Sequence, residues 1–500
     1  MSKKRISFIF IAIFIIASYT NCFADSQNSP EKLDFDLIDG YIRKEMNTGK
    51  IPGAALGIVK GDSIIYLKGY GNAGQGSAVT PETPFFIGST GKTFTALAIR
   101  QLINGGKINE NDYIQKYIKD FNPKYQGKQE SITIKQLLSH TSGLSAADGN
   151  KNYLYNSKYT TGQLVNKIRN ISLVRPAGKD YEYSNLNYMI LGLLIQKVSG
   201  MSYEDYIQKE IFDRLDMKHS YVYREKALKD GLADGHVIFY GKPAAANYPY
   251  PSGALPTGYH ISSVEDMAHY MIAYLNKGYY RNDSIIQNNP FKLSGDPMAD
   301  SYRDNWYDTY WFENTGYPIS DLYLQYYGHE GANPNYTSSL KINQKSRYGL
   351  IVLVNSRDTA QFSKNEVAAW TISKAIMEYV ETGKLPPQTA AKYSYERTGW
   401  IVIFFSLVIT YAVFSIRGLL KFETGKAGVR AILRNLTIDF ILPASAFFLI
   451  PLYYDISWQW LFANNPEQNF LVLSVMLLLI LAGIAKAGIY ACLRIKSTKW

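Results

Sequence analysis

The chain has 500 residues and a formal charge of +11, enough for two or three domains or one large domain with appendages. Much of the positive surplus lies beside apolar segments, which favours membrane topology over nucleic-acid binding. Both cysteines, Cys22 and Cys492, lie in apolar terminal segments, and the six histidines form no HExxH motif or Cys/His cluster, so we expect no disulfide framework, thiol nucleophile, metal site or cofactor.

Residues 1–24 have the pattern of a secretory signal peptide. Basic residues at positions 3–5 precede an apolar run over 6–17, and a polar stretch follows. The prediction is cleavage before Asp25. A lipid anchor on Cys22 and an uncleaved anchor remain as weaker alternatives, because the residues before the cysteine are not small and apolar and the run is short for a full span. All three interpretations imply export.

The exported part is predicted to begin with a helix and a β-hairpin. Residues 31–49 have apolar side chains on or near one helical face, and the helix should end at Ile51-Pro52-Gly53. Residues 54–71 then form two apolar runs around Gly61-Asp62, the pattern of a hairpin.

Residues 84–104 hold the first candidate catalytic side chains. A short apolar run reaches Gly88 and Ser89, and an amphipathic helix is predicted to begin there. Lys92 follows Ser89 by three residues, so both side chains leave the same side of the first turn. A hydroxyl beside an amine that burial can deprotonate is a workable nucleophile–base pair, and a helix N-terminus favours a developing oxyanion.

Two other interpretations compete for these residues. GSTGKT resembles the end of a phosphate-binding loop, GxxxxGK[ST], but the first glycine of that motif would be Phe86, so the loop lacks its opening turn. Ser89 can also be a plain helix cap and Lys92 a solvated charge. SxxK recurs at Ser29 and Ser338, so the motif needs support from elsewhere in the chain.

The segment LLSHTSGL, residues 137–144, places His140, Thr141 and Ser142 in a row. We expect local turn hydrogen bonds from these side chains rather than a catalytic triad, because Ser and Thr beside Gly usually form such bonds.

Residues 174–200 hold the second informative cluster. A Pro-Ala-Gly turn precedes Tyr183-Ser184-Asn185, and a buried helix is predicted to start near Asn187. A tyrosine and an asparagine two apart in a loop can point the same way, so Tyr183 is the candidate for proton transfer and Asn185 for orienting a substrate. The Y-x-N triplet recurs elsewhere, and the setting before a buried helix singles out Tyr183.

Two further segments complete the exported part. Residues 258–275 predict a helix capped by Ser262 or Ser263, with acidic residues in its first turn. Residues 326–358 predict an extended segment, a turn and a second strand at Tyr348–Asn355.

The extended segment supplies the third cluster. His329-Glu330-Gly331 is predicted to form an edge strand whose glycine lets a substrate backbone approach. His329 and the backbone N–H of Ala332 would then face the site. A histidine standing alone is more often structural, so this assignment depends on the other clusters.

The C-terminal part changes character after a linker at 386–398. Three apolar segments follow within 399–500, roughly Gly399–Ile416, Leu436–Tyr454 and Phe470–Tyr490, and each is about long enough to cross a bilayer. The loop after the first segment and the C-terminal tail are rich in Lys and Arg, whereas the loop after the second has neither. By the positive-inside rule the basic loop and the tail are cytoplasmic, so residues 25–398 should lie on the periplasmic or extracellular side of the cell (inner) membrane.

Taken together, the three clusters resemble those of the serine β-lactamases and penicillin-binding peptidases, specifically the class C β-lactamase-related, peptidase S12-like branch. The resemblance rests on Ser-Thr-Gly-Lys at 89–92, Tyr-Ser-Asn at 183–185 and His-Glu-Gly at 329–331, in that order, framed by PGAALGIV, LLSHTSGL and PAG. It covers about residues 31–380, within a predicted hydrolase domain at 25–385. The absence of GxSxG argues against an α/β-hydrolase.

The resemblance implies an α+β fold, with an antiparallel sheet flanked by helices and a helical subdomain that carries YSN. It also implies that Ser89 attacks an amide or lactam carbonyl while Lys92 and Tyr183 share proton transfer. The backbone N–H groups of Ser89 and Ala332 would form the oxyanion hole.

The same resemblance implies that Asn185, His329 and Gly331 bind the substrate. His329 stands where the family's KTG motif has lysine, which removes a fixed positive charge for a substrate carboxylate. The predicted result is weak β-lactamase activity.

An exported domain of this family followed by three membrane helices is similar to the prodrug-activating peptidases of the colibactin and zwittermicin type. Those enzymes remove an N-acyl-D-asparagine cap during export of a natural product. The resemblance extends to Asn333-Pro334-Asn335, and it makes Asn333 the candidate for side-chain recognition. The expected partners are a small peptide-like or acylated substrate and the membrane, without nucleic acid, and a homodimer remains open.

Other functions stay open at this point. D,D-carboxypeptidase, esterase and β-lactamase-like activities are the alternatives within the enzyme class. A non-catalytic penicillin-binding or envelope-sensing protein and a membrane transport component with an inactive external domain are the alternatives outside it.

Overall fold

The computed structural model describes residues 33–151, 154, 158–239, 241–285, 327–357, 368–387, 437–454 and 466–497, with a few single positions between 406 and 462. The predicted signal peptide at 1–24 lies outside the described residues. So do most of the predicted linker and most of the first C-terminal apolar segment.

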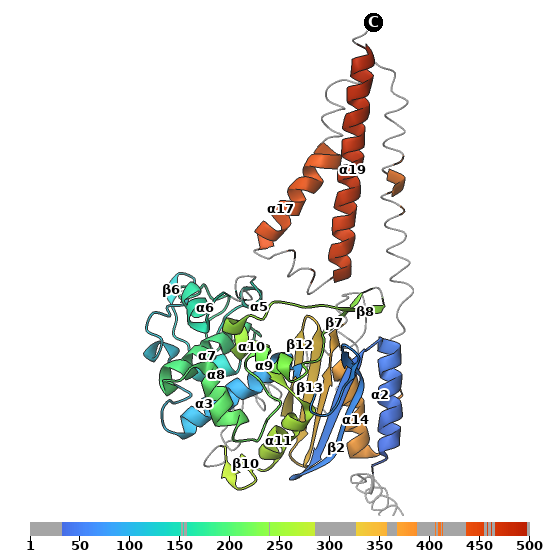
Figure 1. Cartoon of the computed structure of the whole chain (residues 1–500). Helices are drawn as coiled ribbons and strands as arrows, with labels where there is room; N and C mark the ends of the chain where they lie inside the picture. The colour runs from blue at the N-terminus through green and yellow to red at the C-terminus, as the bar shows by residue number, and fades with distance from the viewer. Residues whose placement is uncertain are drawn as a thin grey trace, which may run out of the picture.

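A six-stranded antiparallel sheet forms the centre of the molecule, in the order β12-β13-β14-β1-β2-β3 (Figure 1). Its strands are β1 (Gly53–Lys60), β2 (Ser63–Gly74), β3 (Ser77–Ala78), β12 (Tyr327–Asn333), β13 (Tyr336–Asn343) and β14 (Tyr348–Val354). The hairpin predicted around Gly61-Asp62 joins β1 and β2, and Gly61 has the positive φ of 62° that its turn requires. Pairing of β1 with β14 joins an early and a late segment of the chain.

The segment 326–358 contains two strands that were not predicted, β13 and the short β15 (Ser356–Arg357). Strand β13 was not predicted, because polar residues such as Thr337, Ser338 and Ser339 interrupt the apolar pattern expected of a buried strand. All of its residues are buried. The hydroxyls are satisfied within the fold: Ser338 Oγ donates to Ile87 O, and Ser339 Oγ shares a hydrogen bond with Ser373 Oγ.

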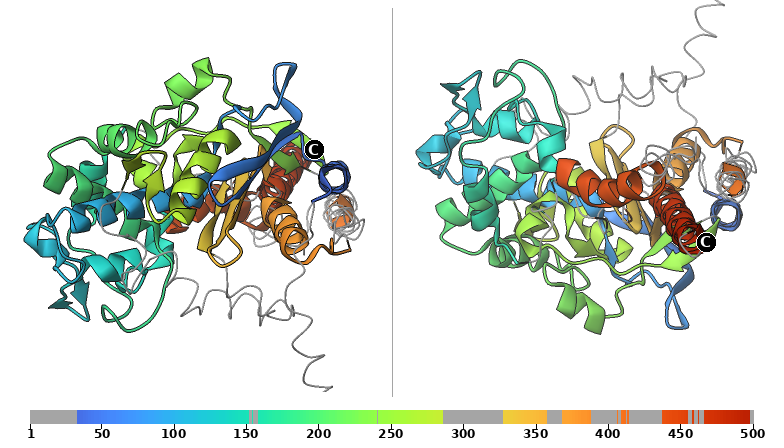
Figure 2. Two further views of the ribbon diagram at one scale, coloured as in Figure 1. Left: turned by 90° about the horizontal axis from the view of Figure 1, so that it is seen from below. Right: turned by 90° about the horizontal axis from the view of Figure 1, so that it is seen from above.

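Helices cover both faces of the sheet (Figure 2). Helices α2 (Phe35–Gly49) and α14 (Ala368–Thr382) pack on one face, where Ile42 and Ile376 contact a cluster that includes Leu56 and Val352. Helix α11 (Val264–Leu275) packs on the other face, between the sheet and the helical part of the molecule. This arrangement leaves β12 at the edge of the sheet.

Capping residues set two helix starts. The N-cap Asp34 fixes the start of α2 at Phe35 rather than near 31, since its carboxylate accepts backbone N–H bonds from the first turn. For α11 the predicted cap Ser263 is confirmed and fixes the helix start at Val264, while the preceding Ile261–Ser262 form the short strand β9.

The helical part is built around the apolar helix α7 (Asn185–Ser199), whose residues 186–195 are all buried. Around it lie α3 (Lys92–Asn104), α4 (Ile134–Leu138), α5 (Ala146–Gly149), α6 (Thr161–Lys167), α8 (Tyr203–Ile207), a π-helical turn (Gln208–Phe212) and α10 (Leu255–Gly258). The remaining elements are α9 (Arg224–Lys229), three 3-10 turns (Gly88–Gly91, Ile114–Lys116, Ser252–Ala254) and short strands β4 (Phe85–Phe86), β5 (Lys124–Tyr125), β6 (Lys128–Gln129), β7 (His236–Phe239), β8 (Lys242–Ala245), β10 (Tyr279–Tyr280), β11 (Asp283–Ser284) and β15 (Ser356–Arg357).

The C-terminal part projects away from this α+β body (Figure 1). It contains a π-helical turn (Thr437–Ile441) that continues into α17 (Leu442–Tyr454), and the long helix α19 (Pro466–Ser497). Among the described residues one helix, over Glu467–Ile489, is long and apolar enough to cross a membrane.

Candidate active site

Ser89 lies in a 3-10 turn, Gly88–Gly91, that leads directly into α3. The predicted helix therefore begins three residues later than Ser89, at Lys92. Gly88 has a positive φ of 53°, and a Cβ at this position would lie under 3.0 Å from the backbone N of Ala332. Only glycine lets the two chain segments approach so closely, and the approach places Ser89 against the edge strand β12.

Lys92 is buried beside Ser89, with 1% of its surface exposed, and its Nζ lies 3.0 Å from Ser89 Oγ. The same Nζ also donates to Asn185 Oδ1 at 2.9 Å and to the backbone O of Thr257. Burial lowers the pKa of the Lys92 amine well below its usual value. A neutral amine has two protons for the amide and carbonyl acceptors, which leaves its lone pair for the Ser89 hydroxyl proton.

Tyr183 approaches Ser89 from the helical side. Its phenol oxygen lies 2.8 Å from Ser89 Oγ. Tyr183 and Ser89 are both partly exposed, so water can reach the Ser89 hydroxyl. Asn185 is the first residue of α7 rather than a loop residue, two positions earlier than the predicted helix start. Helix α7 thus holds the Asn185 side chain against the Lys92 amine.

Hydrogen bonds fix the Ser89 turn to the edge of the sheet. Thr90 Oγ1 bonds to the backbone O of His329 at 3.0 Å and to Ser338 Oγ at 2.7 Å. A Cβ on Gly331 would lie under 3.0 Å from Ile87 O, so this contact also requires glycine. The backbone N–H groups of Ser89 and Ala332 therefore belong to two tightly packed segments, where two donors can serve one oxyanion.

His329 and Asn333 lie on the same strand. The His329 ring centroid is 6.5 Å from that of Tyr183, and its Nδ1 bonds to the backbone O of Glu330 at 2.6 Å. Burial, with a smaller effect of Lys92, lowers the pKa of His329 to about 4, so the ring is neutral at physiological pH. Asn333 is buried at the end of β12, and its backbone O accepts a hydrogen bond from Arg357.

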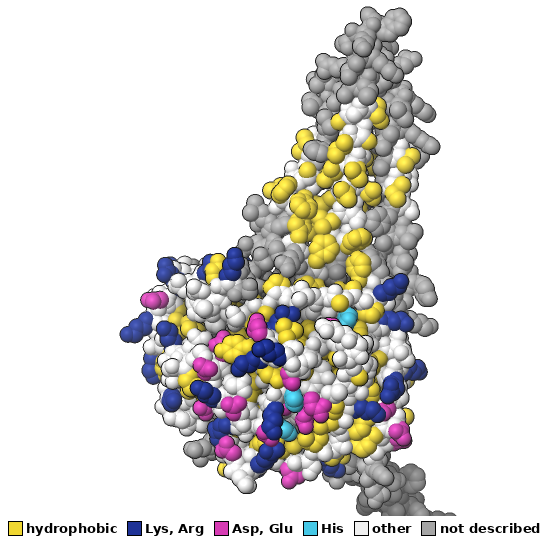
Figure 3. All heavy atoms as spheres, in the orientation of Figure 1, with side chains coloured by type: hydrophobic (Ala, Val, Ile, Leu, Met, Phe, Trp, Pro, Cys, Tyr) yellow, Lys and Arg dark blue, Asp and Glu magenta, His cyan; other side chains and the backbone are white. Residues whose placement is uncertain are grey.

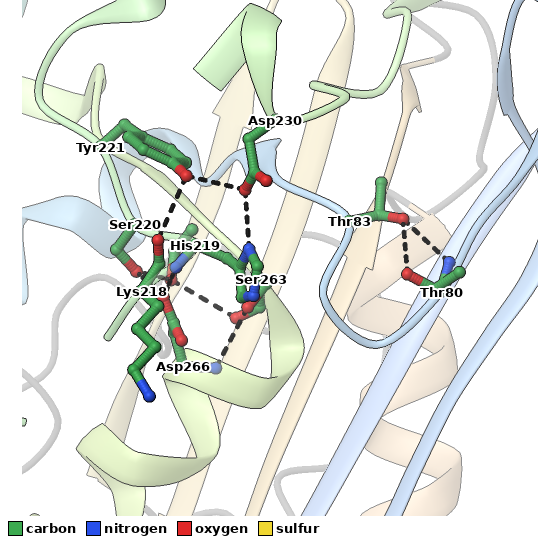
Figure 4. A network of polar contacts seen from close by, with 10 residues as sticks. Thr80, Thr83, Lys218, His219, Ser220, Tyr221, Asp230, Ser263 and Asp266 are labelled. Atoms are coloured by element: carbon green, nitrogen blue, oxygen red, sulfur yellow. Dashed lines mark hydrogen bonds and ion pairs between the residues drawn. The ribbon is translucent and has the colours of Figure 1, made fainter. Parts of the chain in front are cut away.

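A polar network joins residues 219–221 and Asp230 to the start of α11 (Figure 4). Asp266 accepts hydrogen bonds from the His219 backbone N–H and from Ser220 Oγ, both at 2.7 Å, and Ser220 Oγ also bonds to Ser262 Oγ. Ser262 belongs to β9, which pairs with β4, the strand that leads to Ser89. Burial raises the pKa of the Asp266 carboxyl to about 6.

The segment 137–144 forms the predicted local hydrogen bonds and, in addition, long-range ones that were not predicted. Local bonds do occur, as between Ser139 Oγ and Thr141 Oγ1, but Ser142 Oγ also donates to Asn187 Oδ1 at 2.5 Å and His140 Nδ1 accepts from the Ser184 backbone N–H at 3.2 Å. Sequence reasoning missed these partners because they lie more than forty positions away on α7 or just before it. The one local signal is a histidine between apolar residues and a glycine turn.

Within the described ranges, no group of three His, Cys, Asp or Glu residues could hold a metal ion. Ser89, Lys92, Tyr183 and Asn185 form a hydrogen-bonded cluster whose hydroxyl, amine and phenol can take part in proton transfer and nucleophilic chemistry.

Comparisons with known proteins agree with this architecture. The family model described as Beta-lactamase matches residues 38–371. Protein flp of Staphylococcus aureus (strain MW2) is 32% identical over 323 residues, which are 64% of this chain and 62% of that protein. Beta-lactamase-like protein 2 of Dictyostelium discoideum is 27% identical, over 60% of this chain and 57% of the relative. The chain thus spans about three fifths of these curated relatives.

Among solved structures, the octameric penicillin-binding protein homologue from Pyrococcus abyssi superposes with a TM-score of 0.57 at 26% identity, covering 71% of this chain and 80% of its own. FmtA from Staphylococcus aureus shares the fold, with a TM-score of 0.51 at 21% identity over 73% of this chain and 96% of its own. The family match extends over most of the α+β body and includes Ser89, Lys92, Tyr183 and the edge strand. The chain therefore belongs to the β-lactamase family.

Proposed function

We propose that the chain is a serine hydrolase that forms an acyl-enzyme through Ser89. One observation carries this proposal: Ser89 Oγ lies 3.0 Å from the buried Lys92 amine and 2.8 Å from the Tyr183 phenol. A hydroxyl between two groups that can exchange its proton has the arrangement of an activated nucleophile.

In this mechanism Ser89 Oγ attacks the substrate carbonyl carbon and its proton passes to neutral Lys92. The tetrahedral oxyanion accepts hydrogen bonds from the backbone N–H groups of Ser89 and Ala332. The proton moves by way of Tyr183 to the leaving nitrogen or oxygen, the bond to the carbonyl carbon breaks, and an ester on Ser89 remains. Water, deprotonated by Tyr183 and Lys92, then attacks this ester, and the released serine oxygen recovers a proton.

The substrate that we propose is an amide or peptide containing a D-amino acid, such as an N-acyl-D-Asn cap. The neutral His329 ring on the edge strand favours a substrate without a carboxylate at that position, because it supplies no positive charge. Asn185 would orient the substrate amide. Asn333, two residues beyond Ala332, is the proposed recognition residue for the asparagine side chain, although its burial requires the substrate to reach the end of β12.

We further propose that the hydrolase domain, residues 25–385, is exported and anchored in the membrane by its C-terminal part. On the face that Figure 3 shows, hydrophobic side chains gather over the described parts of the projecting C-terminal helices, and the charged side chains in view lie on the body. The candidate span at Glu467–Ile489 supports one crossing. The three-helix anchor, its orientation with the domain outside the cell membrane, and the signal peptide at 1–24 rest on the sequence pattern.

D,D-Carboxypeptidase or esterase activity is the second candidate. The similarity to a penicillin-binding protein homologue favours it, because that relative shares 26% identity as well as the fold. A penicillin-binding sensor without turnover has the same Ser89 site and differs only in the fate of the acyl-enzyme.

The test is substrate turnover by the full chain in detergent micelles. N-Acyl-D-Asn amides, an N-acyl-D-Ala-D-Ala peptide and p-nitrophenyl butyrate are compared, with Ser89→Ala as the matched control. We expect hydrolysis of the D-Asn amide at the highest kcat/KM and none in Ser89→Ala. Preference for the D-Ala-D-Ala peptide or the ester would select the second candidate, and turnover that persists in Ser89→Ala would reject the mechanism.

A further inference from the structure

His140 holds the chain on both sides of Tyr183. The backbone N–H of Glu182 donates to the His140 backbone O at 2.9 Å, and the backbone N–H of Ser184 donates to His140 Nδ1 at 3.2 Å. His140 thus forms hydrogen bonds with the residue before Tyr183 and with the residue after it. The His140 ring also stacks on the Tyr183 ring, with 4.5 Å between centroids and 29° between planes.

The proton positions on this histidine follow from its partners. Because Nδ1 accepts the Ser184 N–H, it carries no proton, and the Asn187 amide therefore donates to it at 2.8 Å. The Asn187 carbonyl in turn accepts from Ser142 Oγ. The imidazole is consequently neutral with its proton on Nε2, and His140 and Asn187 are almost fully buried, so the arrangement is rigid.

The backbone at His140 adopts a conformation that side chains usually avoid. Its φ is +56°, in the left-handed region. Strained positions of this kind persist where the surrounding contacts over-determine them, and here the contacts of His140 include the residues on both sides of Tyr183 and the Tyr183 ring itself.

We propose that His140 is a positioning residue for Tyr183: its ring and main chain hold the phenol oxygen at its distance from Ser89 Oγ. This role rests on the proposed function, in which Tyr183 exchanges a proton with Ser89. His140 itself does not touch Ser89 among the contacts of the described residues.

Two substitutions at His140 distinguish the effect of its hydrogen bond to Ser184 from the effect of its aromatic ring. His140→Phe keeps an aromatic ring but removes the acceptor for Ser184. His140→Asn removes the ring but offers Oδ1 close to the place of Nδ1, and asparagine tolerates positive φ. His140→Gln, whose acceptor is displaced by one bond, replaces the phenylalanine variant if that chain does not fold. His269→Asn, a partly buried histidine on α11 outside the site, is the control.

The experiment measures kcat and KM for p-nitrophenyl butyrate and the rate of Ser89 labelling by a fluorophosphonate, each normalised to the folded fraction from circular dichroism. We expect His140→Phe to lose about 10- to 100-fold in kcat and labelling rate with KM within about threefold, because a misplaced catalytic group costs rate rather than binding. His140→Asn should recover most of this loss, and His269→Asn should match the wild type.

A double-mutant cycle tests whether His140 acts through Tyr183. In a Tyr183→Phe background, His140→Phe should cost little more, since the group that it positions is gone. An unchanged kcat in His140→Phe, an equal loss in the Tyr183→Phe background, or no recovery in His140→Asn would each overturn the positioning role. Labelling or turnover that persists in Ser89→Ala would instead reject the proposed function, and the positioning role with it.

Discussion

The two sides of the site are held in place by different means. On the sheet side, the Ser89 turn and β12 meet through backbone atoms and two glycines, Gly88 and Gly331, that leave no room for a side chain. On the helical side, Tyr183 and Asn185 are held by side-chain hydrogen bonds and ring stacking. Main-chain packing fixes the two segments that carry the proposed oxyanion donors, whereas replaceable polar side chains fix the groups proposed for proton transfer.

Substitutions on the two sides of the site should therefore have different effects. A substitution on the helical side should remove a proton donor or acceptor and leave the fold intact. A larger residue at Gly88 or Gly331 on the sheet side should displace a whole strand, because its Cβ would meet backbone atoms, which cannot move aside as a side chain can.

Replacing the buried amine should have the largest effect. Lys92→Met removes the proposed base while keeping an unbranched side chain in the buried space, and we expect kcat to fall by about 10⁴-fold. Lys68→Met, at a lysine on β2 that pairs with Asp39 away from the site, should stay near the wild-type rate. Steady-state kinetics on p-nitrophenyl butyrate would contradict the role of Lys92 if the two variants behaved alike.

On the sheet side, Gly331→Ala should cost about 10²- to 10³-fold in kcat, the range for loss of an oxyanion donor. Its Cβ would clash with Ile87 O and push β12 away from Ser89. Gly40→Ala is the matched control: a Cβ there meets nothing within 4 Å and lies in α2, so it should raise the melting temperature and leave kcat unchanged. Equal kcat in both variants would show that the glycine contact does not shape the site.

Tyr183→Phe should lower kcat by about 10²-fold, near the lower end for one proton-transfer group, because Lys92 still contacts Ser89. The melting temperature should change little, since the ring and its stacking remain. Tyr279→Phe, at an exposed tyrosine, controls for hydroxyl loss. A large drop in melting temperature without a specific loss of kcat would make Tyr183 a structural residue.

The activity should fall on the acid side, where Lys92 gains a proton and can no longer accept one from Ser89. Its pKa is lowered by burial, so this limb should lie well below the ordinary lysine range. A pH profile of kcat/KM between pH 4 and 10 checks this. Activity confined to strongly alkaline pH would contradict a buried neutral amine.

The smallest expected effect concerns stability. Burial lowers the pKa of His329 to about 4 from 6.5, so its contribution to stability is complete above pH 6.5 and is lost as the pH falls toward 4. His329→Asn should therefore lose less in melting temperature than the wild type between pH 7 and pH 4.5. Identical losses in thermal scans would place His329 in a more solvated position.

Local patterns predicted part of the site. Ser89 and Lys92 lie three apart on consecutive turns, so their proximity is a property of the chain itself, and the turn before α7 singled out Tyr183. The partners of His140 and Ser142 were not predicted, because they lie more than forty residues away in the sequence. The strand β13 was not predicted, because its hydroxyl side chains interrupt the apolar pattern of a buried strand. The same periodic patterns predicted α2 and the first hairpin, whereas end positions depended on individual capping residues.

The most direct test of the account is to find where a mechanism-based label attaches. The full chain is incubated with a fluorophosphonate, digested and mapped by mass spectrometry. We predict one phosphonate adduct, on Ser89, formed more slowly in Lys92→Met and Tyr183→Phe than in the wild type. A label on another residue, or substrate turnover by a chain whose Ser89 stays unmodified under saturating probe, would contradict the claim that this hydroxyl is the nucleophile.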